Sequence, residues 1–317
     1  MKKLLMVLAA IILLVEAPGL AGPIKLEQVS DGASWVVHAN QQQFRKTQTG
    51  RLIREEMVDL GIEENLTNFA NIFSFHPLDD VRDVTIYGTG KDREKAVVLI
   101  DGFFDKERIL SVVRMNPEYK EVKYGEIVLH QWMDENQKDP NNKMMYGCFY
   151  KDDLIVISAG LDAVKHEVDV LKGSANNAAK GLFSQTALNT EGAFFQAAGK
   201  RVGEMVAGED PQAVALKQSD QLGLAIGEIE DNFYIDLSVI ARSEDAAQAI
   251  AKMLDGIIAF ISLPNEGQPL LPDLAKKIKV SYEQSKVQVI FRTEPESVVQ
   301  FLKEQWKKDS QKQTQTQ

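Results

Sequence analysis

The stretch YKDDLIVISAGLDAVKHEVDVL, residues 150–171, predicts a tight polar turn, a strand and then a helix. Its apolar run LIVIS is typical of a buried strand, and Val164, Val168 and Leu171 recur at helical spacing. The stretch YEQSKVQVIFRTEPESVVQFLKE, residues 282–304, repeats this order of signals with few identical residues. The shared order indicates that the chain contains a duplicated module.

The same order can be followed outward through both halves of the chain. In the first half it predicts a strand at 34–39, a helix over 41–61 and a hairpin whose strands flank KDREK at 91–95. In the second half it predicts a strand at 192–200 and hairpins at 221–241 and 277–293. A helix from residue 243 shows one apolar stripe, formed by Ala246, Ile250, Met253, Ile257 and Ile261.

These patterns predict an α+β fold of two tandem related modules. Each would be a mainly antiparallel sheet with helices packed on one face, since hairpins alternate with helices. The predicted organisation is a signal peptide at 1–21, modules at 30–173 and 190–306, a linker at 174–189, and a disordered tail at 307–317.

The N-terminus predicts export from the cytoplasm. Lys2 and Lys3 precede the apolar run LLMVLAAIILLV, and small residues follow near Gly19 and Ala21, as in a secretory signal peptide. The run is shorter than the roughly 20 residues that span a bilayer. A buried N-terminal helix is the alternative. We expect cleavage near Ala21 and a mature chain that is periplasmic or secreted and has no integral membrane span.

Three further stretches carry a resemblance to known proteins. They are ASWVVHANQQQFRKTQTGRLI at 33–53, VTIYGTGKDREKAVVLIDGFFD at 84–105 and MMYGCFYKDDLIVISAG at 144–160. With the N-terminal segment, they resemble a group of uncharacterised exported bacterial proteins of planctomycete type. The resemblance covers most of 30–175 and the layout of the rest. It implies export and the modular layout, and no site residues.

Composition excludes several classes of partner. A formal net charge of −10 disfavours nucleic acid and anionic membrane surfaces, because both are bound through clustered Lys and Arg. A hydrophobic content of 44% is enough for real cores, and a single cysteine rules out an intramolecular disulfide. An unknown protein or a small ligand remains as the partner.

The single cysteine, Cys148, is a candidate nucleophile. If 134–143 is a hairpin loop, Met133 pairs with Met144 and His130 lies opposite Gly147, so His130 points away from the Cys148 thiol. Because a reactive thiol needs a base or positive charge nearby, we expect a buried structural cysteine. A register slip of one residue is the alternative.

The chain carries no recognisable metal or cofactor motif. Its histidines, residues 38, 76, 130 and 166, are far apart in sequence and lack the close spacing of zinc ligands. GTGKD at 88–92 leads into a strand rather than a helix, so it predicts a turn and not a phosphate loop. We therefore expect no metal and no cofactor.

Asp101, Asp105, Phe103 and Phe104 are the remaining candidate site residues. Asp101 follows the run AVVLI and could present a catalytic carboxylate, with Asp105 as its partner. The structural alternative is that Asp101 forms a turn and Asp105 caps the next helix. Phe103 and Phe104 follow the same strand and could form a ligand or partner contact.

The leading functional hypothesis is a non-catalytic exported binding or interaction protein. The alternative is an exported carboxylate- or metal-dependent hydrolase that uses Asp101 and Asp105. A structural component of an envelope assembly is a third possibility, which sequence does not separate from the first.

Overall fold

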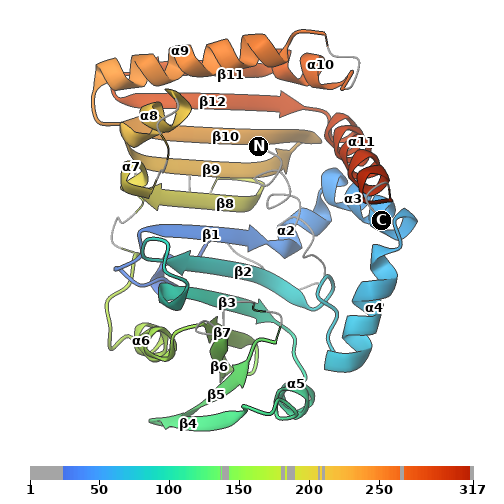
Figure 1. Ribbon diagram of the computed structural model, residues 1–317, viewed down its shortest axis with the longest axis vertical. Helices are drawn as coiled ribbons and strands as arrows, with labels where there is room; N and C mark the ends of the chain where they lie inside the picture. The colour runs from blue at the N-terminus through green and yellow to red at the C-terminus, as the bar shows by residue number, and fades with distance from the viewer. Residues whose placement is uncertain are drawn as a thin grey trace.

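All strands of both modules join one antiparallel sheet (Figure 1). The computed structural model describes residues 24–314 except 136, 138–142, 180–182, 184–189, 206–207, 209–210 and 265–267. Within the described part, the sheet has 12 strands in the order β11-β12-β10-β9-β8-β1-β2-β3-β7-β6-β5-β4. The predicted signal peptide lies outside the described residues.

The first module contains seven strands and five α-helices among its described residues. Its strands are β1 (Trp35–Asn40), β2 (Val81–Gly88), β3 (Ala96–Gly102), β4 (Lys120–Tyr124), β5 (Ile127–Met133), β6 (Met144–Lys151) and β7 (Leu154–Ser158). Its helices are α2 (Gln41–Lys46), α3 (Gln48–Asp59), α4 (Ile62–Phe73), α5 (Lys106–Val113) and α6 (Leu161–Leu171). Short 3₁₀ turns lie at Leu26–Gln28 and Arg93–Lys95.

The second module repeats this plan with fewer strands. Its strands are β8 (Ala193–Lys200), β9 (Ser219–Ile229), β10 (Asn232–Ala241), β11 (Ile278–Glu283) and β12 (Lys286–Thr293). Its helices are α7 (Val202–Met205), α8 (Pro211–Lys217), α9 (Glu244–Ile261), α10 (Leu271–Lys276) and α11 (Pro295–Thr314).

The duplication is visible in the strand order. β1 and β8 pair in the middle of the sheet, with Val37 opposite Ala197. Outward from this pair, the hairpin β2–β3 corresponds to β9–β10, and β7–β6 corresponds to β12–β11. α5 occupies the place of α9 in chain order, and α6 that of α11. The predicted α+β fold of two related modules is confirmed.

Helices α6 and α9 pack on opposite faces of the common sheet. In module 1, Val97, Leu99 and Val156 pack with Val164 and Val168 of α6. We call this side the α6 face. In module 2, Val239, Ala241 and Val287 alternate onto the other side of the sheet and pack against α9. We call that side the α9 face.

The packing of α9 differs in detail from the predicted stripe. The residues buried in the α9 core are Ala247, Ile250 and Ala251, and Ala246 packs beside them half-buried. Ile257 and Ile261 are only half-buried. The helix is therefore rotated toward its small residues, because alanines let it approach the sheet closely.

The predicted helix at 41–61 is broken into α2 and α3. The Thr47 hydroxyl accepts a hydrogen bond from the Gly50 backbone N–H at 2.9 Å and so caps the start of α3. Gly50 is required at this corner, because a Cβ there would lie 2.1 Å from the Phe44 carbonyl oxygen. The sequence prediction omitted α4, which follows directly.

Both predicted boundaries of module 1 lie inside its packed core. Ile24 precedes the expected start at residue 30 and is buried in the cluster under α6. Ala178 and Phe183, within the expected linker, are buried in the same cluster. At the other end of the chain, α11 continues to Thr314, past Lys307, where composition predicts a disordered tail.

Candidate binding surface

Six aliphatic side chains of module 1 lie half-buried on the α9 face. They alternate along β2, β3 and β7 with residues buried on the α6 face, as side chains of a strand must. None of them belongs to a hydrophobic cluster formed by the described residues. The six are Val84, Ile86, Val98, Ile100, Ile155 and Ile157. We call them the apolar strip.

The strand register aligns the strip into two rows. Val98 lies opposite Ile86 on one side and opposite Ile157 on the other. Ile100 lies in the same way between Val84 and Ile155. Directly opposed side chains of neighbouring strands are only about 5 Å apart at Cβ, so the rows form a continuous aliphatic surface.

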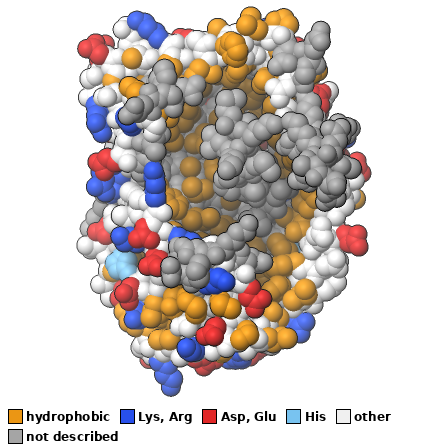
Figure 2. All heavy atoms as spheres, viewed as in Figure 1, with side chains coloured by type: hydrophobic (Ala, Val, Ile, Leu, Met, Phe, Trp, Pro, Cys, Tyr) orange, Lys and Arg blue, Asp and Glu red, His pale blue; other side chains and the backbone are white. Residues whose placement is uncertain are grey.

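The strip lies on the hollowed side of the molecule. Figure 2 shows hydrophobic side chains gathered in a broad hollow on the face seen in Figure 1. In Figure 1, α9 runs along the upper strands, whereas β3 is contacted by α6 from the α6 face and β2 is contacted by the short helix α2. The counterpart of α9, α5, has 8 residues against 18 in α9, and it packs near α4 beyond the strand ends.

The α6 face of module 2 combines charged and polar side chains with the half-buried Ile290 and a small buried cluster of Ala193, Ala225 and Tyr234. Side chains on its α6 face include Asp236, Gln288 and Arg292, and Arg292 Nη1 donates to Asp236 Oδ1 at 2.6 Å. A sheet face exposed to water is normally polar in this way. In module 1 the α9 face of β2, β3 and β7 carries six aliphatic side chains, a feature that solvent exposure alone does not explain.

The aromatic candidates lie at one end of the strip and differ in environment. Phe103 is 47% exposed, and the Arg82 guanidinium stacks 4.9 Å from its ring centre. Phe104 is half-buried and bridges Phe75 and Phe149, at ring-centre distances of 5.3 and 6.5 Å. Phe104 thus closes the strip at the β6 side, and Phe103 remains a predicted surface contact.

Asp101 lies within β3, directly before its last residue Gly102, and does not form the turn of the structural alternative. Its carboxylate contacts Lys25 Nζ at 3.2 Å and the Arg82 guanidinium, which also bridges to Asp153 at 2.7 Å. Asp83 lies directly opposite on β2. Burial, followed by the charge of Asp101, raises the pKa of Asp83 to about 7.

Asp105 lies apart from this group. Its Oδ1 accepts a hydrogen bond from the Arg108 backbone N–H at 2.9 Å, so it caps α5 as the structural alternative expected. The structure therefore pairs Asp101 with Asp83, which sequence analysis had not singled out, and gives Asp105 a capping contact.

Cys148 is a buried core residue. Met133 pairs with Met144 and His130 with Gly147, in the register predicted from the sequence. The thiol is 2% exposed, and burial raises its pKa to about 12, with a further contribution from Glu167. These conditions suppress the thiolate that nucleophilic chemistry requires.

Three of the histidines make separate local contacts. His38 Nδ1 lies 2.9 Å from the Thr85 hydroxyl, His166 Nε2 lies 3.0 Å from that of Ser30, and His130 Nδ1 lies 2.8 Å from that of Tyr119. Among the described residues, no group of three or more His, Cys, Asp or Glu side chains could hold a metal ion.

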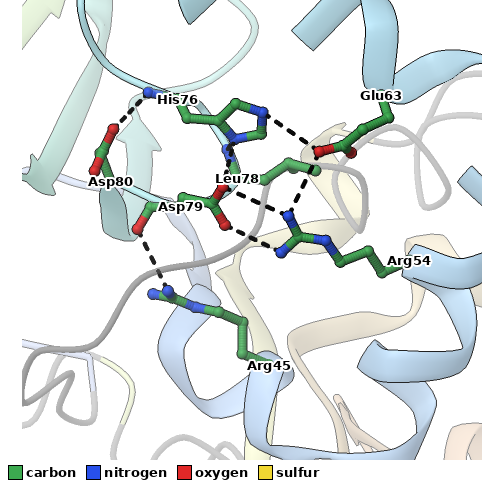
Figure 3. Close-up of polar contacts among 7 residues, drawn as sticks. All are labelled: Arg45, Arg54, Glu63, His76, Leu78, Asp79 and Asp80. Carbon is green, nitrogen blue, oxygen red and sulfur yellow. Dashed lines mark hydrogen bonds and ion pairs between the residues drawn. The ribbon is translucent and has the colours of Figure 1, made fainter. Parts of the chain in front are cut away.

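The fourth histidine joins a charged cluster that connects helices to the loop before β2 (Figure 3). His76 Nδ1 lies 3.2 Å from Asp79 Oδ2, and its Nε2 lies 3.7 Å from Glu63 Oε1. Arg54 contacts both carboxylates, at 3.0 and 3.5 Å, and Arg45 donates to the Asp79 backbone carbonyl. The cluster joins α2, α3 and α4 to this loop, which is a structural role.

The apolar strip was not predicted from the sequence, although the sequence contains a signal for it. The runs AVVLI at 96–100 and LIVI at 154–157 are apolar at every position. A strand with one wet face alternates apolar and polar residues, whereas a continuous apolar run indicates that both faces are covered. Here α6 covers one face, and the other is the strip.

Comparisons with known proteins give a likeness of fold at low identity. No protein-family model matches the chain, and no curated protein matches it in sequence. Crystal forms III, I and IV of TP0453 are similar in structure, with TM-scores of 0.49, 0.48 and 0.45. Sequence identities are 8%, 9% and 10%, over 89% of this chain and 98%, 97% and 97% of the TP0453 chain.

Proposed function

We propose that this protein is exported and acts as a non-catalytic binding protein, with the apolar strip as its binding surface. The observation that carries the proposal is the strip itself: six half-buried aliphatic side chains outside every core of the described chain. Removal of apolar surface from water is favourable by about 25 cal/mol per Å². The part of each strip side chain that remains exposed to water does not contribute this free energy. Covering the strip with a ligand would recover this free energy.

Export is supported by the sequence of residues 1–21. Mass spectrometry of the chain recovered from expressing bacteria would test it. A mature N-terminus near Gly22 in the exported fraction is the expected result, and an intact Met1 in that fraction would contradict it. Among the described residues, no helix is both long and apolar enough to cross a membrane.

The binding surface can be tested with an apolar dye. We expect 1-anilinonaphthalene-8-sulfonate to fluoresce on the folded mature protein and to lose most of this signal in the double variant Ile100→Thr/Ile157→Thr. Threonine keeps the β-branched shape, so the sheet should persist, which far-UV circular dichroism would verify. Ile290→Thr is the matched control. Ile290 is also half-buried, but it lies in module 2 on the α6 face, away from the strip.

The dye test has a clear negative outcome. Equal dye fluorescence in the folded wild type, the double variant and the control would exclude the strip as the binding surface. It would leave the dye bound elsewhere or nowhere.

A second candidate function is the carboxylate-dependent hydrolase, and one observation favours it. Asp83 and Asp101 face each other across β2 and β3, and burial, followed by the charge of Asp101, raises the pKa of Asp83 to about 7. A carboxyl group whose pKa is raised toward neutral pH can serve as a general acid or base. Against it, Lys25 and Arg82 already neutralise Asp101. A hydrolytic activity abolished by Asp101→Asn would establish this candidate.

A further inference from the structure

The second module shows what covers this kind of sheet face. α9 packs on β11, β12 and β10 through its small and aliphatic residues. Ala247, Ile250 and Ala251 of the helix meet Val239 and Val287 of the strands. Helix α9 is amphipathic. The acidic residues of its first turn, Glu244 and Asp245, and its N-cap residue Ser243 are exposed to solvent. An amphipathic helix is therefore the natural cover for the α9 face in this fold.

The corresponding strands of module 1 present the same face of the sheet. β3 and β7 occupy the places of β10 and β12, and four of the six strip residues lie on them: Val98, Ile100, Ile155 and Ile157. The crossover helix that should lie over them is α5, which has 8 residues and a single buried one, Leu110. Among the described residues, module 1 therefore has this apolar face without a covering helix of the length of α9.

We propose that the apolar strip is a docking site for one amphipathic α-helix of a partner protein, which takes the place that α9 takes in module 2. The inference rests on the proposed binding function and names the partner. Three adjacent strands span about 10 Å between their axes, which matches the 10–12 Å diameter of a helix with side chains.

Backbone chemistry favours a helix over an extended peptide. The strip is a sheet face, so its backbone N–H and C=O groups are used in the ladders between β2, β3 and β7. An extended peptide laid on it would bury backbone groups without partners, whereas a helix satisfies its own. The partner helix should carry aliphatic residues at i, i+3, i+4 and i+7, as helix-in-groove ligands do.

A peptide with the sequence of α9 can serve as the probe for this proposal. A labelled peptide of residues 243–263, SEDAAQAIAKMLDGIIAFISL, carries the α9 surface that covers the equivalent strands. Fluorescence anisotropy would measure its binding to the full mature protein. A peptide with Ile250→Asp and Leu254→Asp has the same length with a broken apolar face, and serves as the matched control peptide.

We expect saturable binding of the α9 peptide. Its affinity should fall at least tenfold for the variant Ile100→Thr/Ile157→Thr and less than twofold for Ile290→Thr. The broken-face peptide should bind at least tenfold more weakly than the intact one. If the peptide fails to bind, or binds equally to the strip variant, the helix inference is overturned.

A hydrocarbon probe separates this inference from the proposed function. Dodecyl maltoside, added below its micelle concentration, presents an apolar chain without a helix. If it binds in a strip-dependent way and the peptide does not, the binding function stands and the helix partner is wrong. If neither probe binds and the dye signal is also independent of the strip, both proposals fail.

Discussion

Asp83 of β2 lies directly opposite Asp101 of β3, so two carboxyl groups face each other on one side of the sheet. Asp83 is 6% exposed, and Asp101 contacts Lys25 and Arg82. The second negative charge is disfavoured at this position because water is excluded and a carboxylate already stands opposite. The pair therefore links the stability of the fold to pH.

The substitution Asp83→Asn should raise the free energy of unfolding at pH 8 and leave it nearly unchanged at pH 4. The pKa of Asp83 is about 7 in the fold against an ordinary 3.8, so the folded chain holds this proton more tightly than the unfolded chain. Stability is then lost as pH rises from about 4 to about 7. The asparagine removes this loss, on the order of 2–4 kcal/mol. Urea unfolding at both pH values would measure it, and an equal effect at pH 4 would contradict it.

Glu167→Gln should act in the same direction over a higher pH range. The Glu167 side chain is 0% exposed, and burial raises its pKa to about 8 from an ordinary 4.5. Its stabilising contribution is therefore present below about pH 4.5 and lost as pH rises through 8. Glutamine keeps the shape and can still accept the hydrogen bond from Tyr87. Thermal unfolding at pH 6 and pH 9 should show a larger gain at pH 9; a loss at both would exclude this account.

The Cys148 thiol should be inert in the folded protein. With 2% exposure and a pKa raised to about 12, it should react with Ellman's reagent at pH 8 about 1,000-fold more slowly than in 6 M guanidinium. The unfolded chain is the internal control, since it contains the same single thiol. Fast labelling of the native state would mean that the β6 strand opens, or that the thiol has a basic neighbour.

Two glycine substitutions should have opposite effects on stability. Gly50→Ala should destabilise the fold by about 2–4 kcal/mol, because the added Cβ would lie 2.1 Å from the Phe44 carbonyl oxygen. Gly256→Ala in α9 is the matched control and should stabilise by about 0.5–1 kcal/mol, since nothing lies within 4 Å of its Cβ. Chemical unfolding would measure both; a stabilised Gly50→Ala variant would refute the close contact.

Local signals predicted the hairpins correctly, but β4 and the helices α4, α7, α8 and α10 were not predicted. The register that pairs His130 with Gly147 followed from loop length alone. β4, with the sequence KEVKY, was missed because it is short and mostly charged, as an edge strand often is. α4 was missed because Leu60 and Gly61 end one helix and Ile62 at once begins another.

The candidate site was harder to predict than the fold. Asp101 could be recognised as a strand-end carboxylate, but its partner Asp83 lies 18 positions earlier and is brought opposite only by the β2–β3 register. Val98 and Ile157 lie even further apart in sequence. Their alignment on the α9 face depends on the register of β3 and β7, which no single stretch of sequence specifies.

The sequence by itself determined the secondary structure of most elements, their order in two related halves, and the segregation of apolar side chains. These depend on periodicity and turn residues, which act over a few positions. Only the tertiary structure decided that Val37 of β1 and Ala197 of β8 meet and join both halves into one sheet. It also decided which faces the helices cover. Strand pairing and face coverage depend on packing between residues distant in the chain, where many arrangements satisfy the same local pattern.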